Sequence, residues 1–277
     1  MGMVVNFNAA ATNVQRNLGQ ASKSLNQSIQ RLSSGLRVNS AADDPASFVI
    51  SEQMRSKADG MSQAIRNNND TINLVKTAEG ALNEVSSLLG QMRTLAVHAA
   101  NEGVNSVDDL AADQAALAAA GDSIDRIAVS TRFNGKVLLD GSFTAQNLQI
   151  GEEAGDFISA NFPTLDATAM GVDSGSLDVT ATGGGTAAIT AIDTAIKTIS
   201  IIRAGLGVGQ KYLLETVNSS LAVSVENIRS SESAIRDADM SKEMVDFMRN
   251  NIMMQAGTSM LAQANQSSQS VLTLLRG

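Results

Sequence analysis

The sequence predicts a mainly α-helical protein, an elongated rod in which the chain runs out and back with coiled-coil packing. We expect the terminal helices to pair as an inner core, and a small β-hairpin region to complete the fold. Three observations predict it: apolar residues at helical spacing at both ends of the 277-residue chain, a heptad repeat in the interior, and an unusual composition. Aromatic residues make up only 3% of the chain and there are two prolines, which favours long helices in narrow layers.

An apolar stripe runs along each end of the chain. The first consists of Val14, Leu18, Ala21, Leu25, Ile29, Leu32 and Leu36. The second consists of Val245, Met248, Ile252, Ala256, Met260, Leu261, Ala264, Leu272 and Leu275. Such spacing indicates amphipathic helices, and stripes of this length are too continuous for idle tails. We therefore expect the two ends to pack against each other or against neighbouring copies of the chain.

The interior predicts further helices. Pro45 follows a break at residues 33–35 and can begin a helix, since proline is favoured at the first helical position. A strict heptad of apolar residues over 72–99 indicates a coiled-coil seam. Another helix is expected from about Ser106 to Ser130, with two aspartates in its first turn, and a long apolar seam resumes over 189–228.

Residues 131–163 follow a different pattern. Four of the seven phenylalanines lie there, and Asn134-Gly135 and Asp140-Gly141 separate short alternating runs, which indicates β-hairpins. Residues 164–185 are rich in Thr, Ser, Gly and Ala, so we expect a short, exposed and weakly structured excursion.

These segments define the expected domains. Residues 1–44 and 240–277 form the paired terminal helices, and residues 45–130 and 186–239 form an outer helical rod. Residues 131–163 are the β-hairpin part of that rod, and residues 164–185 are the variable excursion.

Charge and composition exclude several classes of protein. The net charge is −8, but residues 1–44 carry +2 and residues 240–277 carry +1, so the middle carries −11. No basic stripe is present to neutralise phosphates, which argues against nucleic-acid binding. There is no cysteine, hence no disulfide or thiolate chemistry. No apolar run approaches the length expected for membrane insertion, and residues 1–15 show no secretory signal, so export would proceed without a cleaved signal peptide.

The candidate catalytic and cofactor motifs each lack a residue that the corresponding site requires. The glycines of residues 205–211 resemble a phosphate loop, but Gln210 stands where either nucleotide motif requires glycine. Close helix packing or a local bend explains these glycines better. His98 is the single histidine and has no partner at the spacing of a zinc site or catalytic triad. We therefore expect no enzyme activity, no cofactor and no metal site.

Methionines concentrate near the C-terminal end. Six of the twelve lie on the last predicted helix and occupy more than one of its faces: Met240, Met244, Met248, Met253, Met254 and Met260. Methionine adapts to irregular interfaces. This distribution favours a helix that contacts several neighbours at once.

Four motifs together resemble bacterial flagellin. They are residues 31–44 (RLSSGLRVNSAADD), 77–84 (TAEGALNE), 132–135 (RFNG) and 255–266 (QAGTSMLAQANQ). The resemblance covers roughly residues 1–160 and 186–277, with the motifs in the family's order.

The resemblance implies a structural subunit that polymerises into the flagellar filament used for motility. It implies export by the flagellar type III apparatus, an extracellular location in the filament, and partners that include further copies of the chain, an export chaperone, and the filament cap and junction proteins. Two alternatives remain open. A hook–filament junction protein would share the out-and-back helices, whereas a metalloprotease flagellin would need a zinc-binding insert.

The resemblance also implies a patch that Toll-like receptor 5 recognises in some flagellins. The matching positions here are Gln91, Arg93 and Leu95, and Ala116 stands at a position that is acidic in recognised flagellins. Gln91 replaces an arginine and keeps neither its charge nor its planar fork. We expect weakened recognition by this receptor.

Overall fold

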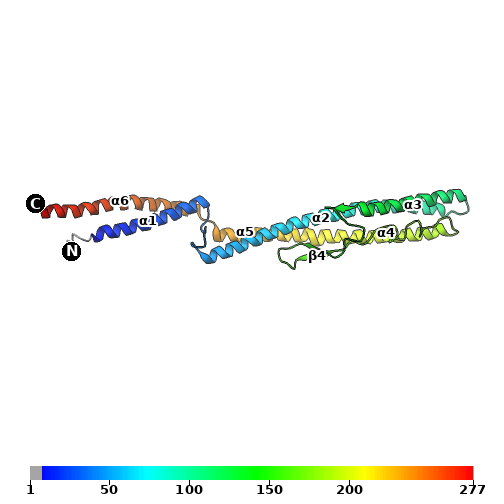
Figure 1. Ribbon diagram of the computed structural model, residues 1–277, viewed down its shortest axis with the longest axis horizontal. Coiled ribbons are helices and arrows are strands. Elements are labelled where there is room, and N and C mark those ends of the chain that lie inside the picture. Colours follow the sequence, from blue (N-terminus) through cyan, green and yellow to red (C-terminus); the bar gives the residue numbers. More distant parts are fainter. Residues whose placement is uncertain (1–7, 277) are drawn as a thin grey trace. The chain divides into compact units, whose positions relative to one another are not determined.

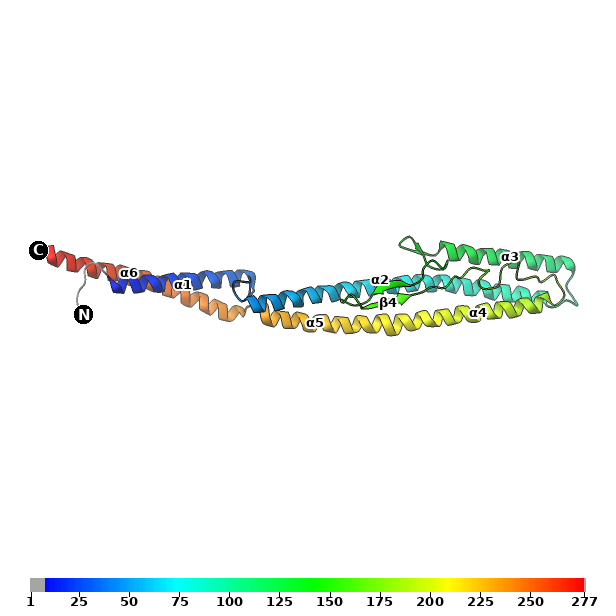
Figure 2. The same ribbon diagram turned by 60° about the horizontal axis from the view of Figure 1, so that its bottom comes forward.

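The computed structural model describes residues 8–276, with side chains described for residues 8–266 (Figures 1 and 2). The helices are α1 Ala9–Ser34, α2 Pro45–Ala99, α3 Val107–Ser130, α4 Gly184–Val208, the π-helical η1 Gly209–Glu215, α5 Thr216–Arg236 and α6 Met240–Arg276. The strands are β1 Arg132–Phe133, β2 Lys136–Val137, β3 Gln146–Gln149 and β4 Phe157–Ala160. The predicted mainly-α class is confirmed.

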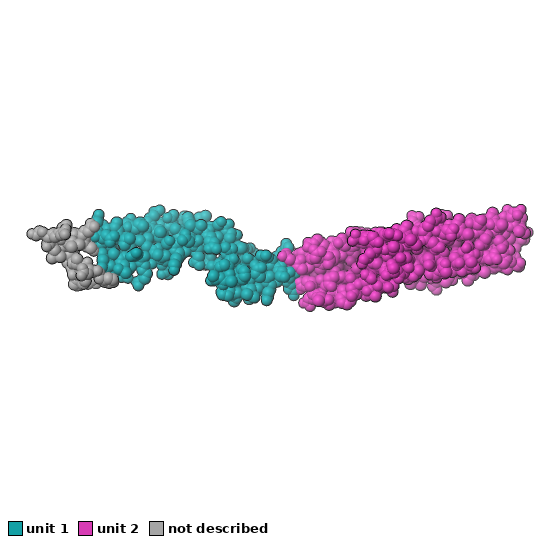
Figure 3. Space-filling view, in the orientation of Figure 1, with its two compact units in different colours: residues 1–57, 227–277 teal, residues 58–226 magenta. Residues whose placement is uncertain are grey.

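The chain divides into two compact units (Figure 3). The terminal unit contains residues 1–57 and 227–277, and the second unit contains residues 58–226. Both boundaries fall inside continuous helices, α2 and α5. The expected inner domain of residues 1–44 and 240–277 is thus extended here by the first turns of α2 and the last turns of α5.

In the terminal unit, α1 and α6 lie side by side and run antiparallel (Figures 1 and 2). Asn8 caps α1, since its side chain accepts a hydrogen bond from the Ala11 amide. Gly35 ends α1 with a φ of 73° and donates its amide to the Arg31 carbonyl, a left-handed termination that glycine adopts without strain.

The core of the second unit is built on α2. The heptad positions Ala78, Leu82, Val85, Leu89, Met92, Ala96 and Ala99 are each at most 1% exposed. They pack with Leu117 and Ile124 of α3 and with Ile192 and Ile199 of α4 in one buried cluster. The seam predicted from the heptad therefore forms the centre of the hydrophobic core of this unit.

The small β region contains two antiparallel pairs, β1 with β2 and β3 with β4, which confirms the predicted hairpins. Asn134 and Gly135 connect β1 to β2 with positive φ values of 47° and 80°, the geometry of a tight two-residue turn. Asn68 of α2 is buried and donates its side-chain amide to the Ile150 carbonyl at 3.2 Å, which anchors the second hairpin on the helix.

Residues 164–183 contain no helix or strand, but the expectation that residues 164–185 form an exposed excursion is wrong for their apolar residues. Its spaced apolar residues are at most 2% exposed and belong to the core: Leu165, Ala167, Val172, Leu177 and Val179. Polar side chains of α3 hold the segment. Asp125 accepts the Ala167 amide at 2.6 Å, and Gln114 accepts the Val179 amide at 2.9 Å. The abundance of small polar residues concealed these anchors, which are too widely spaced to show helical or strand periodicity.

The glycines of residues 205–211 do not serve close packing. A Cβ atom added at Gly205, Gly207 or Gly209 would meet no atom within 4 Å outside its own helix. The helix instead changes register here, because the π-helical η1 follows directly and Gly209 is its first residue. These glycines therefore lie at a change from α- to π-helical hydrogen bonding within one uninterrupted helix.

One helical stretch differs from the expectation about membranes. Gly184–Arg236 contains an 18-residue window of mean hydropathy 1.3 with at most two charged residues, so its length and composition match those of a spanning helix. Of that window, 28% is buried inside the protein. The core helices of soluble proteins meet the same criterion, so the match does not assign the helix to a bilayer.

Candidate assembly surface

The contact between α1 and α6 follows a heptad on both helices. On α1 the better-buried positions are Ala11, Val14, Leu18, Ala21, Leu25, Ser28 and Leu32. On α6 they are Glu243, Phe247, Asn250, Met254, Gly257, Leu261 and Ala264. Steps of three and four residues keep both rows facing each other along the pair. We call these two rows the terminal seam.

The helices approach closely where Gly257 faces Leu18. A Cβ atom on Gly257 would lie 2.9 Å from Leu18 Cγ, closer than real Cβ contacts come. The absence of a side chain at Gly257 therefore sets the separation of α1 and α6 at this point.

The seam contains buried polar side chains. Glu243 is 8% exposed and Asn250 is 5% exposed, whereas the apolar seam residues of α6 are only half-buried. Arg31 Nη1 lies 3.7 Å from Glu243 Oε2 across the two helices. A polar residue in a helical seam favours one register at a cost in stability. The polar seam residues therefore favour one register of α1 against α6, while the apolar seam residues of α6 remain only partly buried.

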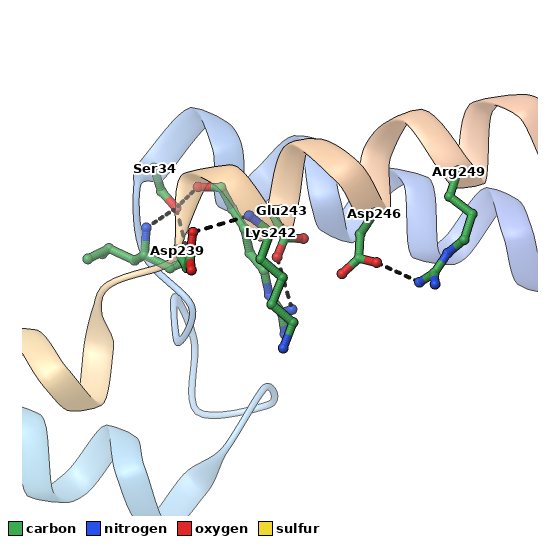
Figure 4. A network of polar contacts seen from close by, with 8 residues as sticks. Ser34, Asp239, Lys242, Glu243, Asp246 and Arg249 are labelled. Carbon is green, nitrogen blue, oxygen red and sulfur yellow. Dashed lines mark hydrogen bonds and ion pairs between the residues drawn. The ribbon is translucent and has the colours of Figure 1, made fainter.

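Polar contacts organise the start of α6 (Figure 4). The Asp239 carboxylate accepts the amides of Ser241 and Lys242 at 2.9 and 3.1 Å, and so satisfies two donors that the helix leaves free. One turn later Arg249 donates to Asp246 at 2.5 Å.

Another set of contacts lies at the two linkers, residues 35–44 between α1 and α2 and residues 237–239 between α5 and α6. The sequence did not indicate these contacts. The Arg37 amide donates to the Arg236 carbonyl at 2.7 Å, and the Ala238 amide donates to the Gly35 carbonyl at 2.9 Å. The Arg236 guanidinium is nearly buried, with Nη1 2.6 Å from Glu52 Oε1. Its partner is 184 residues away along the chain, so no local spacing pointed to this pair.

Outside the terminal seam, α6 carries large apolar residues that remain in solvent. They are between 46% and 65% exposed: Met240, Met244, Val245, Met248, Ile252, Met253 and Met260. We call these seven residues the outward face. They occupy more than one face of the helix, and Met253 and Met260 border a groove together with Val14 and Leu18 of α1. Exposed apolar residues gathered on one helix in this way are typical of an interaction site.

The predicted polymerisation residues are thus divided between two surfaces. Val14, Leu18, Leu25, Leu32, Leu261 and Ala264 belong to the terminal seam, whereas Val245, Met248, Ile252 and Met260 belong to the outward face. Ala256 and Ile29 are also exposed, and Leu36 is half-buried beside the linkers. The side chains of Leu272 and Leu275 lie outside the described residues.

The predicted receptor positions lie on α2 in the second unit. Gln91 is exposed and Leu95 is partly buried against the core. Arg93 donates through Nε to Asp193 Oδ1 on α4 at 2.7 Å. This hydrogen bond and the opposite charge raise the pKa of Arg93, so its guanidinium is charged but already engaged. Ala116 is exposed on α3.

His98 has a partner that the sequence did not indicate. Its Nδ1 atom lies 2.7 Å from Asp113 Oδ2 on α3, and the Asp113 side chain is 11% exposed. The hydrogen bond and charge of Asp113 raise the pKa of His98 above its ordinary value of 6.5. Over the described part of the chain, no group of three or more His, Asp or Glu side chains is placed to hold a metal ion.

Comparisons with known proteins agree on one family. The model of the bacterial flagellin N-terminal helical region matches residues 5–144, and that of the C-terminal helical region matches residues 189–275. The chain is 42% identical over 274 residues to a protein named flagellin from Halalkalibacterium halodurans, covering 99% of this chain and 100% of the relative. It is 41% identical over 305 residues to flagellin from Bacillus subtilis, with the same coverage.

Two further proteins are similar to this chain. The chain is 40% identical over 288 residues to the flagellar filament 33 kDa core protein of Treponema phagedenis, covering 99% of this chain and 100% of the relative. Among solved structures, the crystal structure of Bacillus cereus flagellin has a TM-score of 0.46 at 28% identity, covering 59% of this chain and 88% of that one.

Proposed function

Because this chain belongs to the bacterial flagellin family and is a structural subunit of the flagellar filament, we propose that it polymerises through the terminal seam and the outward face of α6. The family is a structural one. Self-association into a filament is its common property, and what remains to be assigned in this chain is which residues make the contacts.

The observation that supports this proposal is that α1 and α6 alone do not cover their own apolar residues. Leu18, Leu25 and Leu261 of the seam remain half-buried, and the outward face of α6 is exposed. Burial of apolar surface against further helices contributes about 25 cal/mol per Å², reduced by the cost of ordering the partners. A contact between different surfaces of successive copies repeats without closing and so builds a helical filament.

Substitution of Ile252 tests this surface. Ile252 is 65% exposed in the isolated chain, so Ile252→Lys leaves the subunit folded. Burial of the added charge between copies raises the critical concentration for assembly by about tenfold or more, as sedimentation measures it. The matched control is Val104→Lys, an equally radical change at a residue that is 78% exposed in the second unit. Normal assembly of the Ile252→Lys protein would exclude this part of α6 from the interface.

We propose further that the subunit is secreted by the flagellar type III apparatus and becomes extracellular in the filament. Before assembly its outward face is open, and a helix-binding export chaperone fits that face by apolar contact. The filament cap and the junction proteins are the other expected partners. Two measurements test this route. The chain is expected to accumulate in the medium of cells that lack the cap, and to be absent from the medium of cells that lack the export apparatus.

A further inference from the structure

A row of methionines from the outward face winds around α6. Met240, Met244 and Met248 follow at four-residue spacing, and Ile252, Ala256 and Met260 continue the row. Side chains four residues apart form a ridge that inclines across a helix. The methionines of this row are 46–59% exposed: Met240, Met244, Met248 and Met260. Met253, close to Met260 on the helix, is 46% exposed. We call the five methionines the methionine ridge.

Methionines elsewhere in the described chain are better protected. Met92 is 0% exposed in the core of the second unit. Met54, Met61, Met170 and Met254 are half-buried. Oxidation of methionine follows the exposure of the side chain, so peroxide reaches the methionine ridge first.

We propose that the methionine ridge is an oxidation site whose modification by hydrogen peroxide blocks self-assembly. In this step a sulfur lone pair attacks one peroxide oxygen, the O–O bond breaks and an S–O bond forms. The sulfur loses two electrons to the peroxide, and the proton of the transferred oxygen passes to the departing hydroxide, which leaves as water. The inference rests on the proposed role of α6 in assembly.

The two states of the protein respond differently to the added oxygen. In the free subunit the sulfoxide faces water, so the fold of the terminal unit is little affected. Between copies the same dipole is buried, and its lost hydration is not replaced unless a hydrogen-bond donor meets it. Oxidation therefore weakens assembly and leaves the subunit folded.

The direct test compares peroxide-treated and untreated subunits. Peptide mass spectrometry is expected to place oxygen on the methionine ridge before Met92, and the critical concentration for assembly is expected to rise by about tenfold or more. Treatment with methionine sulfoxide reductases A and B and dithiothreitol is expected to restore assembly, because the two enzymes reduce both sulfoxide epimers. Unchanged assembly of fully oxidised subunits would overturn the inference.

Leucine variants assign the effect to these residues. Replacement of all five ridge methionines by leucine conserves volume and removes the reactive sulfur, so the variant is expected to assemble after peroxide treatment. Met244→Leu/Met248→Leu serves if the fivefold variant does not fold, and it is expected to retain part of the resistance. The matched control, Met61→Leu/Met170→Leu, is expected to stay sensitive. Equal sensitivity of the ridge variants and the control would refute the assignment.

Peroxide footprinting of filaments separates this inference from the proposed function. If the ridge methionines oxidise as fast in filaments as in free subunits, the proposed assembly surface is wrong. If filaments protect them and oxidised subunits still assemble at the normal concentration, only the oxidation inference fails. Protection in the filament together with failed assembly of oxidised subunits supports both.

Discussion

At the scale of single residues, pairs that lie far apart in the sequence decide the local chemistry. His98 meets Asp113 across two helices, and Arg93 meets Asp193 on a third. In each pair at least one partner side chain is exposed to solvent, so each pair contributes modestly to the stability of the fold. Their importance lies in which charges remain available for other partners.

The His98 pair predicts a small pH dependence of the second unit. Asp113 favours protonated His98 in the fold, so the pKa of His98 is raised above 6.5. The stabilisation is fully present below pH 6.5 and is lost as the pH rises through the higher folded pKa. NMR titration of the His98 ring measures this pKa directly. In Asp113→Asn it is expected to fall, and an unchanged pKa would show that the pair does not form in solution.

The uncharged side chain of Gln91 leads us to predict weak activation of the receptor. Because Arg93 is engaged by Asp193 and Gln91 carries no charge, the chain is expected to be a weak agonist of Toll-like receptor 5 in a reporter-cell assay. Gln91→Arg is expected to increase potency by about tenfold. Asn73→Arg adds the same charge at another exposed position of α2 and is expected to leave potency unchanged. Full potency of the unmodified chain would contradict this prediction.

At the scale of elements, α6 carries apolar residues on several faces, and a glycine helps to decide which of them meet α1. The absence of a Cβ atom at Gly257 lets Leu18 approach, while Glu243 reaches Arg31 on the same side. Outside the seam, the methionine ridge and Ile252 remain in solvent. The helix can thus hold its partner in the same chain and still present apolar surface to other copies.

Substitution of Gly257 tests this geometry. Gly257→Ala gains up to about 1 kcal/mol of helix propensity, but overpacking against Leu18 costs about 1–3 kcal/mol, so a net loss is expected. The midpoint of filament heat depolymerisation is expected to fall. Gly19→Ala is the matched control, because a Cβ atom there meets nothing within 4 Å and only the propensity gain remains. If Leu18→Ala does not reduce the penalty of Gly257→Ala, the close crossing is not its cause.

At the scale of the whole molecule, the chain separates a well-covered unit from a poorly covered one. The second unit encloses a continuous core along α2, α3 and α4. In the described part of the terminal unit, the apolar seam residues other than Ala21 are only partly buried, and the best-buried seam positions are partly polar. Stability in one unit and incompleteness in the other suit a subunit that is folded when free and ordered fully only when assembled.

Truncation tests this division of roles. Deletion of residues 261–277 removes Leu261 and Ala264 from the terminal seam and leaves the second unit intact. The truncated chain is expected to unfold cooperatively at nearly the normal temperature in calorimetry, because that transition reports the second unit. It is expected to form no filaments in electron microscopy after salt-induced assembly. Filaments of normal length would contradict the assembly role of the C-terminal helix.

Local patterns were sufficient for much of this architecture. The heptad of α2, the capping box of Ser106 and Asp109 at the start of α3, and the Asn134-Gly135 turn each follow from residues close together in the sequence. The amphipathic character of both ends follows in the same way. The four flagellin motifs likewise indicate the family from the sequence alone.

Tertiary structure alone decided how these elements use their side chains. It selected Gly257, Leu261 and Ala264 for the seam and left Met248 and Ile252 outside, and it buried Leu165 and Val179 in a segment whose composition indicated exposure. It also joined Arg236 to Glu52 and His98 to Asp113. Periodicity determines that a helix has an apolar side, because side-chain direction is a local property. Which partner covers that side depends on close approach between distant segments, and only the folded chain contains that information.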